Sequence, residues 1–370
     1  MLICFYCDTA NIAGKDCRGI DAGNPGMGGT EYMFLLLATY LLRQDNGLTV
    51  VFLCTAPITT EACLRVHCVI DDYDAVVQSR NLGADILVIK NNVYAARMYE
   101  LIDSLAVKTV VWGHNFLPFE VYSQYVACRY IVKHVCVGQQ QYNRLFAHPL
   151  VEKSTFIYNT SAFPAWQTEK TAVAMNVVYM GGIYPSKGFH VLARQWKQIH
   201  GKIPEARLQV IGSGNLYDGR QVLGPFGIAD SAYERVFMPH LLDEQGKLLP
   251  SVQFFGNLGR EKYHVFRAAA VGVVPCVDTE TFCISAVEMS AAELPVVSIG
   301  RMGLLDTVVD QVTGLLVNRE QDLASAVVWL LQNPAAGRWL GQTGRKYVAT
   351  KFAIAGVAKQ WQSLFTELAG

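Results

Sequence analysis

The stretch VVYMGGIYPSKGF (177–189) decides the fold, because a strand–helix pattern that has already run through the first half of the chain starts again there. Its apolar first part (177–182) predicts a buried strand, and the loop that follows leads into a helix expected over 187–200. Strands of a parallel sheet covered by helices on both faces are near-continuous apolar runs. A second set of such runs therefore predicts a second doubly wound domain.

Strands and helices alternate along both halves of the chain. In the first half, the expected strands are 2–7, 48–54, 84–89, 109–112 and 134–138, and the expected helices are 31–43, 92–105, 119–129 and 140–147. In the second half, the expected strands are 177–182, 206–212, 252–256, 271–275, 294–300 and 313–317, and the expected helices are 187–200, 261–269, 283–292, 320–332 and 356–368. The predicted fold is α/β, with two doubly wound Rossmann-like domains.

The length of 370 residues fits two domains of roughly 150–200 residues each. A polar, proline-containing segment near 160–175 is the expected connection. We therefore expect an N-terminal Rossmann-like domain over 1–165 and a second one over 166–350. The helical segment within 351–370 has no strand of its own to cover, so we expect it to pack back on the first domain.

The composition gives the chain no net charge, although a local basic patch stays open. Lys+Arg and Asp+Glu both number 31, so no net field attracts nucleic acid, and we expect no nucleic-acid partner. The ten cysteines fall mostly inside apolar runs, as is typical of reduced, core-filling cysteine in a cytoplasmic protein. No pair of cysteine motifs has zinc-like spacing, so no metal site is expected.

The N-terminus MLICFYCDTA lacks a basic region and a small-residue cleavage site, and it is interpreted as a first strand. The longest apolar stretch, YMFLLLATYLL (32–42), is too short to span a bilayer and favours a buried helix. We expect a cytoplasmic protein. Peripheral contact with the inner face of a membrane stays open.

Two glutamates with seven residues between them, Glu280 and Glu288, follow the apolar strand GVVPC (272–276). Glu280 precedes a helix expected to begin near Phe282, and Glu288 lies within it, so both could border one crevice at the carboxyl end of the strand. The amides of residues 281–284 would point into the same crevice and bind anionic or hydroxyl oxygens. Such a site suits a polyol that carries phosphate. The alternative is a pair of solvated glutamates, which is common in helical sequence.

Two glycine-containing loops are candidates for phosphate contact. In GNPGMGGTE (23–31), Gly28 and Gly29 let the backbone approach a ligand closely, but the loop does not match the dinucleotide-binding fingerprint. In GGIYPSKGF (181–189), Lys187 is expected in the first turn of a helix, where a lysine is slightly unfavourable unless an anion is bound. A flexible loop and a solvated lysine are the alternatives.

His114 follows the strand segment VVW. It is expected at the carboxyl ends of the strands of the first sheet, where doubly wound folds bind ligands. It would face the second domain across a cleft. A structural or merely exposed histidine is the alternative.

Taken in chain order, these segments resemble the retaining glycosyltransferases of family 4, which have the GT-B fold, with two Rossmann-like domains facing a central cleft. The resemblance covers nearly the whole chain. The matching segments are GGTE (28–31), GHN around His114, HVCVGQQQYNRL (134–145), YNTSAF (158–163), MGGIYPSKGF (180–189), VIGSG (210–214), VQFFGNLGREKYHVFRAAAVGVVPC (252–276), the E-x7-E run, GLLD (303–306) and TGLLV (313–317).

The resemblance implies a retaining, metal-independent enzyme of the hexosyltransferase type. It would move a sugar from a nucleotide diphosphate sugar, with UDP-sugars favoured and GDP-sugars next, to a glycan, lipid-linked or small-molecule acceptor. Such enzymes serve polysaccharide or glycoconjugate biosynthesis. The nucleotide sugar is a substrate, and no cofactor is implied.

The resemblance also implies roles for single residues. Glu280 would hold hydroxyls of the donor sugar, Lys187 would neutralise the departing diphosphate, and His114 would touch the sugar near the reacting carbon. These three are the expected catalytic residues. The remaining donor-binding residues would be Gly28 and Gly29 at the diphosphate, Thr281, Phe282 and Cys283 through their amides, and Glu288 at the ribose.

The chain departs from the family pattern around the glutamate pair. Gly182 stands where the family has an arginine five residues before Lys187, and Arg260 or Arg301 could substitute for it. Cys283 stands where the family usually has glycine. Two alternatives therefore stay open: a catalytically silent protein that binds a nucleotide or glycan or supports a partner transferase, and a nucleotide-sugar epimerase.

Overall fold

The computed structural model describes residues 1–44, 47–161, 163 and 174–370. Contacts divide the chain into two compact units. Unit 1 comprises Met1–Ala162 and Phe352–Gly370, and unit 2 comprises Phe163–Lys351. The boundary predicted at residues 165 and 166 lies outside the described residues, and the chain returns to unit 1 at Phe352.

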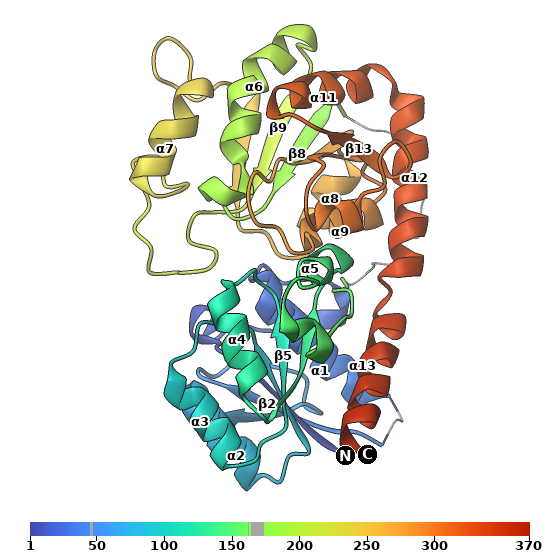
Figure 1. The fold of residues 1–370 in the computed structure, drawn as a ribbon. Coiled ribbons are helices and arrows are strands. Elements are labelled where there is room, and N and C mark those ends of the chain that lie inside the picture. The colour runs from blue at the N-terminus through green and yellow to red at the C-terminus, as the bar shows by residue number, and fades with distance from the viewer. Residues whose placement is uncertain (45–46, 162, 164–173) are drawn as a thin grey trace. The chain divides into compact units, whose positions relative to one another are not determined.

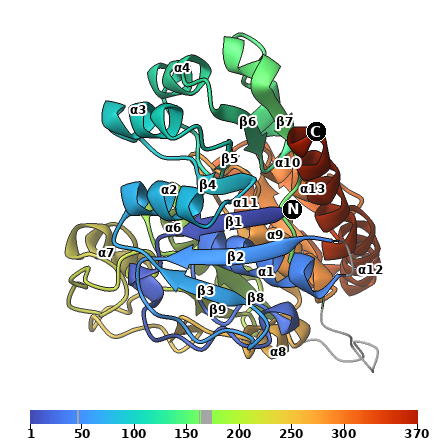
Figure 2. The same ribbon diagram turned by 90° about the horizontal axis from the view of Figure 1, so that it is seen from below.

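Unit 1 is built on a seven-stranded parallel sheet with the order β3-β2-β1-β4-β5-β6-β7 (Figures 1 and 2). The central strands are apolar and buried on both faces, as a doubly wound sheet requires. Their bounds are β1 Leu2–Cys7, β2 Thr49–Cys54, β3 Arg65–Cys68, β4 Ile86–Lys90, β5 Thr109–Gly113, β6 Ile131–Cys136 and β7 Ser154–Phe156.

The helices of unit 1 include the last helix of the chain. They are α1 Gly29–Arg43, α2 Asp72–Asn81, α3 Ala96–Ser104, α4 Phe119–Ala127, α5 Gln139–Asn143 and α13 Ile354–Ala369. Helix α13 packs beside α1, with the Trp361 ring 4.8 Å from the Trp112 ring and the Phe365 ring 6.1 Å from the Phe5 ring (Figure 1). The Lys108 ammonium also donates to the Leu368 carbonyl at 2.8 Å. The C-terminal segment thus helps to close the core of unit 1.

Unit 2 repeats the architecture with a six-stranded parallel sheet in the order β10-β9-β8-β11-β12-β13. The strands are β8 Asn176–Met180, β9 Arg207–Ile211, β10 Val252–Gly256, β11 Val271–Val274, β12 Val296–Ile299 and β13 Gly314–Val317. The helices are α6 Phe189–Lys202, α7 Ser231–Phe237, α8 Lys262–Arg267, α9 Ile284–Ala291, α10 Leu304–Thr307, α11 Leu323–Gln332 and α12 Pro334–Lys351. Two parallel-sheet Rossmann-like units confirm the predicted α/β fold class.

Several local predictions were wrong. Strands β3 and β7 and helices α2, α7, α10 and α12 were not predicted. The helix expected over 140–147 is only the short α5, and the strand expected over 134–138 starts earlier, as β6. The helix expected from Lys187 begins at Phe189.

Along the part of the chain that the structure describes, no helix combines the length and the apolar character needed to cross a lipid bilayer.

Candidate functional site

The switch point of the unit 2 sheet lies at β8. The chain passes from β8 to β9 on one side, and β11 then pairs with the other side of β8. Loops that leave neighbouring parallel strands on opposite sides of such a point open a crevice at their carboxyl ends, where doubly wound folds bind ligands. The two loops that leave β8 and β11 carry Lys187 and Glu280 respectively.

The structure brings Lys187 and Glu280 together. The Lys187 Nζ lies 2.7 Å from Glu280 Oε2, although the residues are 93 positions apart in sequence. Their side chains are 25% and 13% exposed, so the pair is shielded but still reached by solvent. Sequence reasoning selected both residues but did not predict that they pair.

The position of Lys187 depends on Gly188. Lys187 ends a 3₁₀ turn, Pro185–Lys187, and is not in the first turn of α6 as predicted. Gly188 follows with a φ of 74°, and a Cβ there would lie 1.9 Å from the Pro275 carbonyl oxygen. Only glycine allows this left-handed turn and this close approach. The loop after β8 is therefore held against the loop after β11.

The Lys187 ammonium stays charged in this setting. Burial alone lowers the pKa of Lys187, but the neighbouring Glu280 carboxylate, the Tyr217 phenol and the Cys276 thiol raise it, and the net pKa lies well above its ordinary value. A shielded, permanently charged ammonium with a carboxylate beside it can bind a phosphate oxygen while the carboxylate accepts from a hydroxyl.

Glu288 has a different environment from Glu280. It lies inside α9 and is 2% exposed. Its Oε1 accepts from the Tyr263 hydroxyl at 2.9 Å and lies 2.8 Å from the ammonium of Lys262, which is itself only 3% exposed. Glu288 is thus a member of a buried, hydrogen-bonded ion pair between α8 and α9.

The segment between the glutamates is already engaged by the protein. The Cys283 amide donates to Glu280 Oε1 at 3.0 Å, so it already has a hydrogen-bond partner within the protein. Cys283 has a φ of 73° and caps α9, which is why the family glycine suits this position. Thr281 and Phe282 are buried, and a Cβ at Gly303 would lie 2.4 Å from the Phe282 nitrogen.

Two tyrosines occupy the space beside Gly182. The rings of Tyr184 and Tyr217 stack with centroids 5.6 Å apart and planes at 24°. A Cβ at Gly182 would lie 2.5 Å from Cε2 of Tyr184 and 3.2 Å from Cε2 of Tyr217. A longer side chain at position 182 would therefore displace this stack. Sequence reasoning missed both tyrosines, although each lies in a loop that follows a central strand.

The predicted site residues of unit 1 lie at the start of α1 and just after the end of β5. Gly28 is the N-cap of α1 and Gly29 its first residue. His114 follows β5, is 8% exposed and has its ring 4.7 Å from the Trp112 ring. Burial, and to a lesser degree the charge of Lys90, lowers the pKa of His114 to about 3. His114 is therefore neutral at physiological pH.

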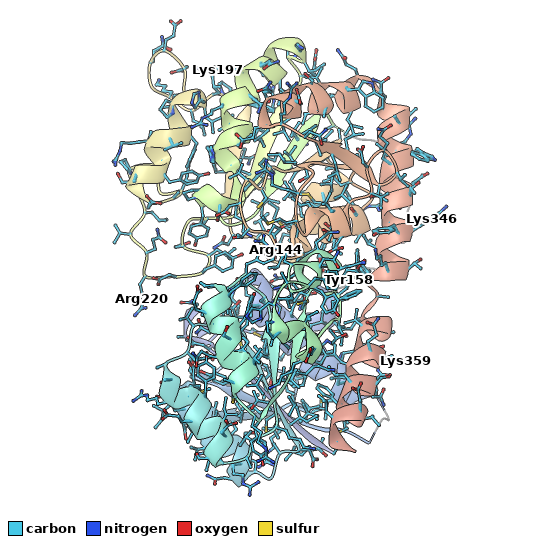
Figure 3. The ribbon with its side chains drawn as sticks, in the orientation of Figure 1. Arg144, Tyr158, Lys197, Arg220, Lys346 and Lys359 are labelled. Carbon is cyan, nitrogen blue, oxygen red and sulfur yellow. The ribbon has the colours of Figure 1, made fainter. Side chains whose placement is uncertain are left out.

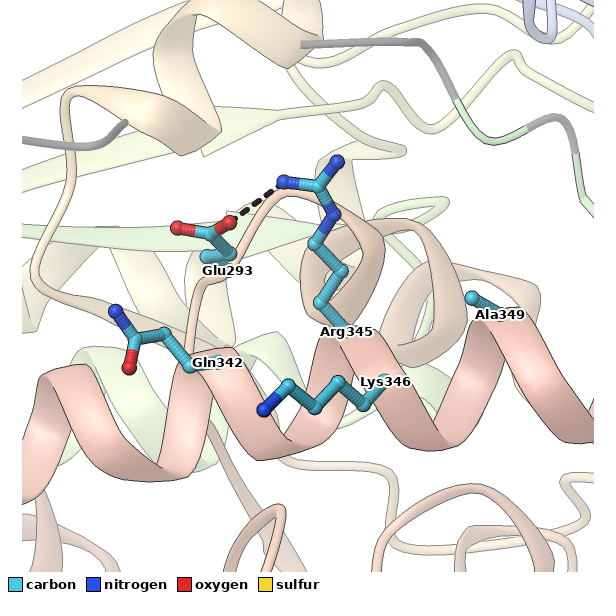
Figure 4. Close-up of a pocket in the computed structure, with 5 residues that line it drawn as sticks. All are labelled: Glu293, Gln342, Arg345, Lys346 and Ala349. Atoms are coloured by element: carbon cyan, nitrogen blue, oxygen red, sulfur yellow. Dashed lines mark hydrogen bonds and ion pairs between the residues drawn. The ribbon is translucent and has the colours of Figure 1, made fainter. Parts of the chain in front are cut away.

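A pocket of about 440 Å³ opens elsewhere in unit 2, on the face of α12. Its lining residues are Glu293, Gln342, Arg345, Lys346 and Ala349 (Figure 4). The Arg345 guanidinium donates to Glu293 at 2.6 Å. None of the predicted site residues lines this pocket.

Within the described ranges, no group of three or more His, Cys, Asp or Glu side chains is arranged to hold a metal ion.

The candidate site lies in a part of the chain that matches a known family. Residues 174–333 match the family model described as glycosyl transferases group 1. The matched range contains Lys187, Glu280 and Glu288.

Two curated relatives match about half of the chain. The capsular polysaccharide biosynthesis glycosyltransferase CapM of Staphylococcus aureus is 27% identical over 192 residues, which is 50% of this chain and 44% of that protein. The D-inositol 3-phosphate glycosyltransferase of Mycobacteroides abscessus is 30% identical over 193 residues, 51% of this chain and 39% of that protein. The matched region thus spans less than half the length of either relative.

Solved structures match the chain over its whole length. Sucrose-phosphate synthase from Thermosynechococcus elongatus superposes with a TM-score of 0.72 at 19% identity, covering 100% of this chain and 99% of that one. HepE from Anabaena, solved in complex with UDP-glucose, gives a TM-score of 0.72 at 14% identity, covering 99% and 100%. These structures share the fold, and together with the family model and the curated relatives they confirm the predicted resemblance to glycosyltransferases. Residues 174–333 therefore match the glycosyl transferases group 1 family, and the chain as a whole has the GT-B fold.

Proposed function

We propose that the protein transfers a sugar from a nucleotide diphosphate sugar to an acceptor, with Lys187 and Glu280 at the donor. The observation that carries this proposal is their 2.7 Å ion pair at the switch point of the unit 2 sheet, inside the range that matches the glycosyltransferase family. A diphosphate needs a cation to balance its charge, and the hydroxyls of a sugar need a group that accepts their hydrogen bonds. The pair offers both groups side by side.

Lys187 would act on the leaving group. As the bond between the anomeric carbon and the phosphate oxygen breaks, negative charge grows on the diphosphate, and a preorganised ammonium stabilises it most at that moment. Glu280 would accept from donor-sugar hydroxyls, since an ionised carboxylate has acceptor sites beyond those that the Lys187 ammonium and the Cys283 amide use.

The reaction would proceed with retention and without a metal ion. The acceptor oxygen would bond to the anomeric carbon on the face that the phosphate leaves, and the acceptor proton would pass to the departing phosphate oxygen. A UDP-sugar is the favoured donor, which agrees with HepE having been solved with UDP-glucose, and a GDP-sugar is next. A glycan or lipid-linked compound is the proposed acceptor class.

The proposal assigns Glu288 a supporting role at the ribose. The carboxylate is buried, so its contact with a ligand would need Lys262 or Tyr263 to share it. Roles for the amides of Thr281, Phe282 and Cys283, and for Gly28, Gly29 and His114 in unit 1, stay predictions.

A donor-turnover assay tests the proposal. Wild type, Glu280→Ala and the surface control Arg319→Ala would be incubated with UDP-, GDP- and ADP-sugars, and nucleotide release would be measured with and without glycan acceptors. Arg319 forms an exposed ion pair with Asp322, remote in sequence from both loops, and its variant should turn over like wild type. We expect turnover that Glu280→Ala abolishes. Nucleotide binding without turnover of any sugar would instead favour a catalytically silent protein.

A further inference from the structure

The ion pair between Lys187 and Glu280 leaves a charge problem at the proposed donor site. A nucleoside diphosphate carries at least two negative charges at neutral pH, and the one ammonium at this point already faces a carboxylate. The position that could have held a second cation is Gly182, where Tyr184 and Tyr217 fill the space. Another cation must therefore reach the site if a diphosphate binds there.

Arg301 contacts the loop after β11, which also bonds to the segment that carries Lys187. Its Nη1 donates to the Val277 carbonyl at 2.9 Å. The Val277 amide in turn donates to the Ser186 carbonyl at 3.3 Å, one residue before Lys187. The loop after β11 is thus bonded on one side to the segment that carries Lys187 and on the other side to the Arg301 guanidinium.

The turn that carries Arg301 is also fixed to Glu280. The Gly303 amide donates to the Glu280 carbonyl at 2.9 Å, and a Cβ at Gly303 would collide with the backbone of Thr281 and Phe282. The guanidinium therefore sits on a turn whose position is set by the acidic residue of the pair. A rigid support of this kind is what a preorganised anion contact needs.

Three other basic side chains of unit 2 are paired with carboxylates. Lys262 pairs with Glu288, and Arg345 pairs with Glu293. Arg220 follows β9 but is 93% exposed, pairs with Asp218 and projects outward from its loop (Figure 3). Among the described residues, by contrast, no carboxylate forms an ion pair with Arg301, and its guanidinium donates to the Val277 carbonyl.

We infer that Arg301 is the second cation of the proposed diphosphate site and binds phosphate oxygens together with Lys187. A guanidinium has five N–H donors in a planar fork that matches phosphate geometry, and the bond to Val277 uses only one of them. That bond also orients the fork before the ligand arrives. The inference rests on the proposed function and deepens it.

Calorimetric titration with nucleoside mono- and diphosphates tests the inference. Wild type, Arg301→Gln, Arg301→Lys and the matched control Arg319→Gln would each be titrated with UDP and UMP, or with the guanosine or adenosine pair if one of those binds better. Arg301→Gln should weaken diphosphate binding by at least about tenfold and monophosphate binding clearly less. Arg301→Lys should recover part of the loss, and Arg319→Gln should bind like wild type.

Two outcomes would overturn the inference while the proposed function stands: Arg301→Gln binding the diphosphate as tightly as wild type, or losing mono- and diphosphate equally, as expected if Arg301 only shapes the loop. A wild-type protein that binds no nucleoside diphosphate would overturn the proposed function itself, and this inference with it. Thermal unfolding of each variant shows that the comparison is made between folded proteins.

Discussion

Glu280 and Glu288 were predicted to belong to one sequence motif, but they lie in opposite physical settings. Glu280 lies in a loop, shares its carboxylate between the Lys187 ammonium and the Cys283 amide, and retains some exposure. Glu288 lies inside α9, and its carboxylate is fully enclosed with Lys262 and Tyr263. The sequence spacing between the two glutamates therefore does not predict the role of either carboxylate.

Their different exposure indicates which glutamate can exchange hydrogen-bond partners. A shielded but solvent-reached ion pair can open to admit a ligand at low cost, because water and the ligand replace what is lost. A buried pair cannot, since removing one partner leaves an uncompensated charge in a low-dielectric core. We expect Glu280 to act on the ligand and Glu288 to act mainly on the structure around it.

The largest expected effect is that of Glu288→Ala on stability. The substitution removes the carboxylate that faces the buried Lys262 ammonium. Unit 2 should therefore lose about 3–5 kcal/mol of unfolding free energy, measured by urea denaturation. The double variant Glu288→Leu/Lys262→Met removes both charges and should recover most of that loss. A single variant as stable as wild type would show that the pair is not buried in solution.

Glu280→Gln should separate activity from stability. The isosteric amide keeps a hydrogen-bond acceptor but loses the charge, so nucleotide release from the donor sugar should fall about 100-fold. The free energy of unfolding should change by only about 1 kcal/mol, because the pair is reached by solvent. A stability loss as large as that of Glu288→Ala would remove the contrast between the two glutamates.

His114 should make unit 1 sensitive to acid. Its pKa is about 3 when folded and about 6.5 when unfolded, so the unfolded chain binds the extra proton and stability falls as the pH drops below about 6.5. At pH 5 the loss from this one group is on the order of 2 kcal/mol. His114→Gln should therefore narrow the gap between unfolding midpoints at pH 7 and pH 5.

The buried His134 serves as an internal reference for that experiment. Burial lowers the pKa of His134 to about 3 as well, so the His114 variant should keep the share of acid sensitivity that His134 contributes. An unchanged gap in His114→Gln would mean that His114 is solvated and titrates normally in the folded protein.

The smallest expected effect is that of Tyr263→Phe. It removes one hydrogen bond to the Glu288 carboxylate and leaves the Lys262 contact, so the cost should be about 1 kcal/mol of stability, read from urea denaturation. Diphosphate affinity should not change. A marked loss of nucleotide binding at unchanged stability would instead place Glu288 in direct contact with the ligand.

Apolar strand segments that alternate with helical segments sufficed to predict the two-sheet fold. The missed elements have identifiable causes. Strand β3 (RVHC) is short, polar and at the edge of its sheet, so it lacks the apolar run that marks the central strands. Helix α12 contains Gly337, Gly341 and Gly344, which disfavour a helix in isolation.

Tertiary packing explains why α12 forms nevertheless. A Cβ at Gly341 would lie 2.3 Å from the Glu293 carbonyl oxygen, so the glycine lets α12 approach the turn before β12 closely. Glu293 in that turn adopts a φ of 59° and pairs with Arg345 of α12. No local pattern in the sequence signals this contact.

The residues of the candidate site were predictable by type, but their partners were not. Lys187 and Glu280 were selected because each follows a strand, yet their contact depends on the order of strands in the sheet. The burial of Glu288 depends on Lys262 from α8, which the sequence presents as an ordinary surface lysine. The tyrosines beside Gly182 come from two different loops.

Calorimetric titration of wild type and Lys187→Ala with UDP, GDP and ADP is the most direct test of the central claim, that the loops after β8 and β11 form a diphosphate site. Wild type should bind at least one of these nucleotides, and Lys187→Ala should bind it at least about tenfold more weakly at an unchanged unfolding midpoint. Equal affinity in the two folded proteins would contradict the claim.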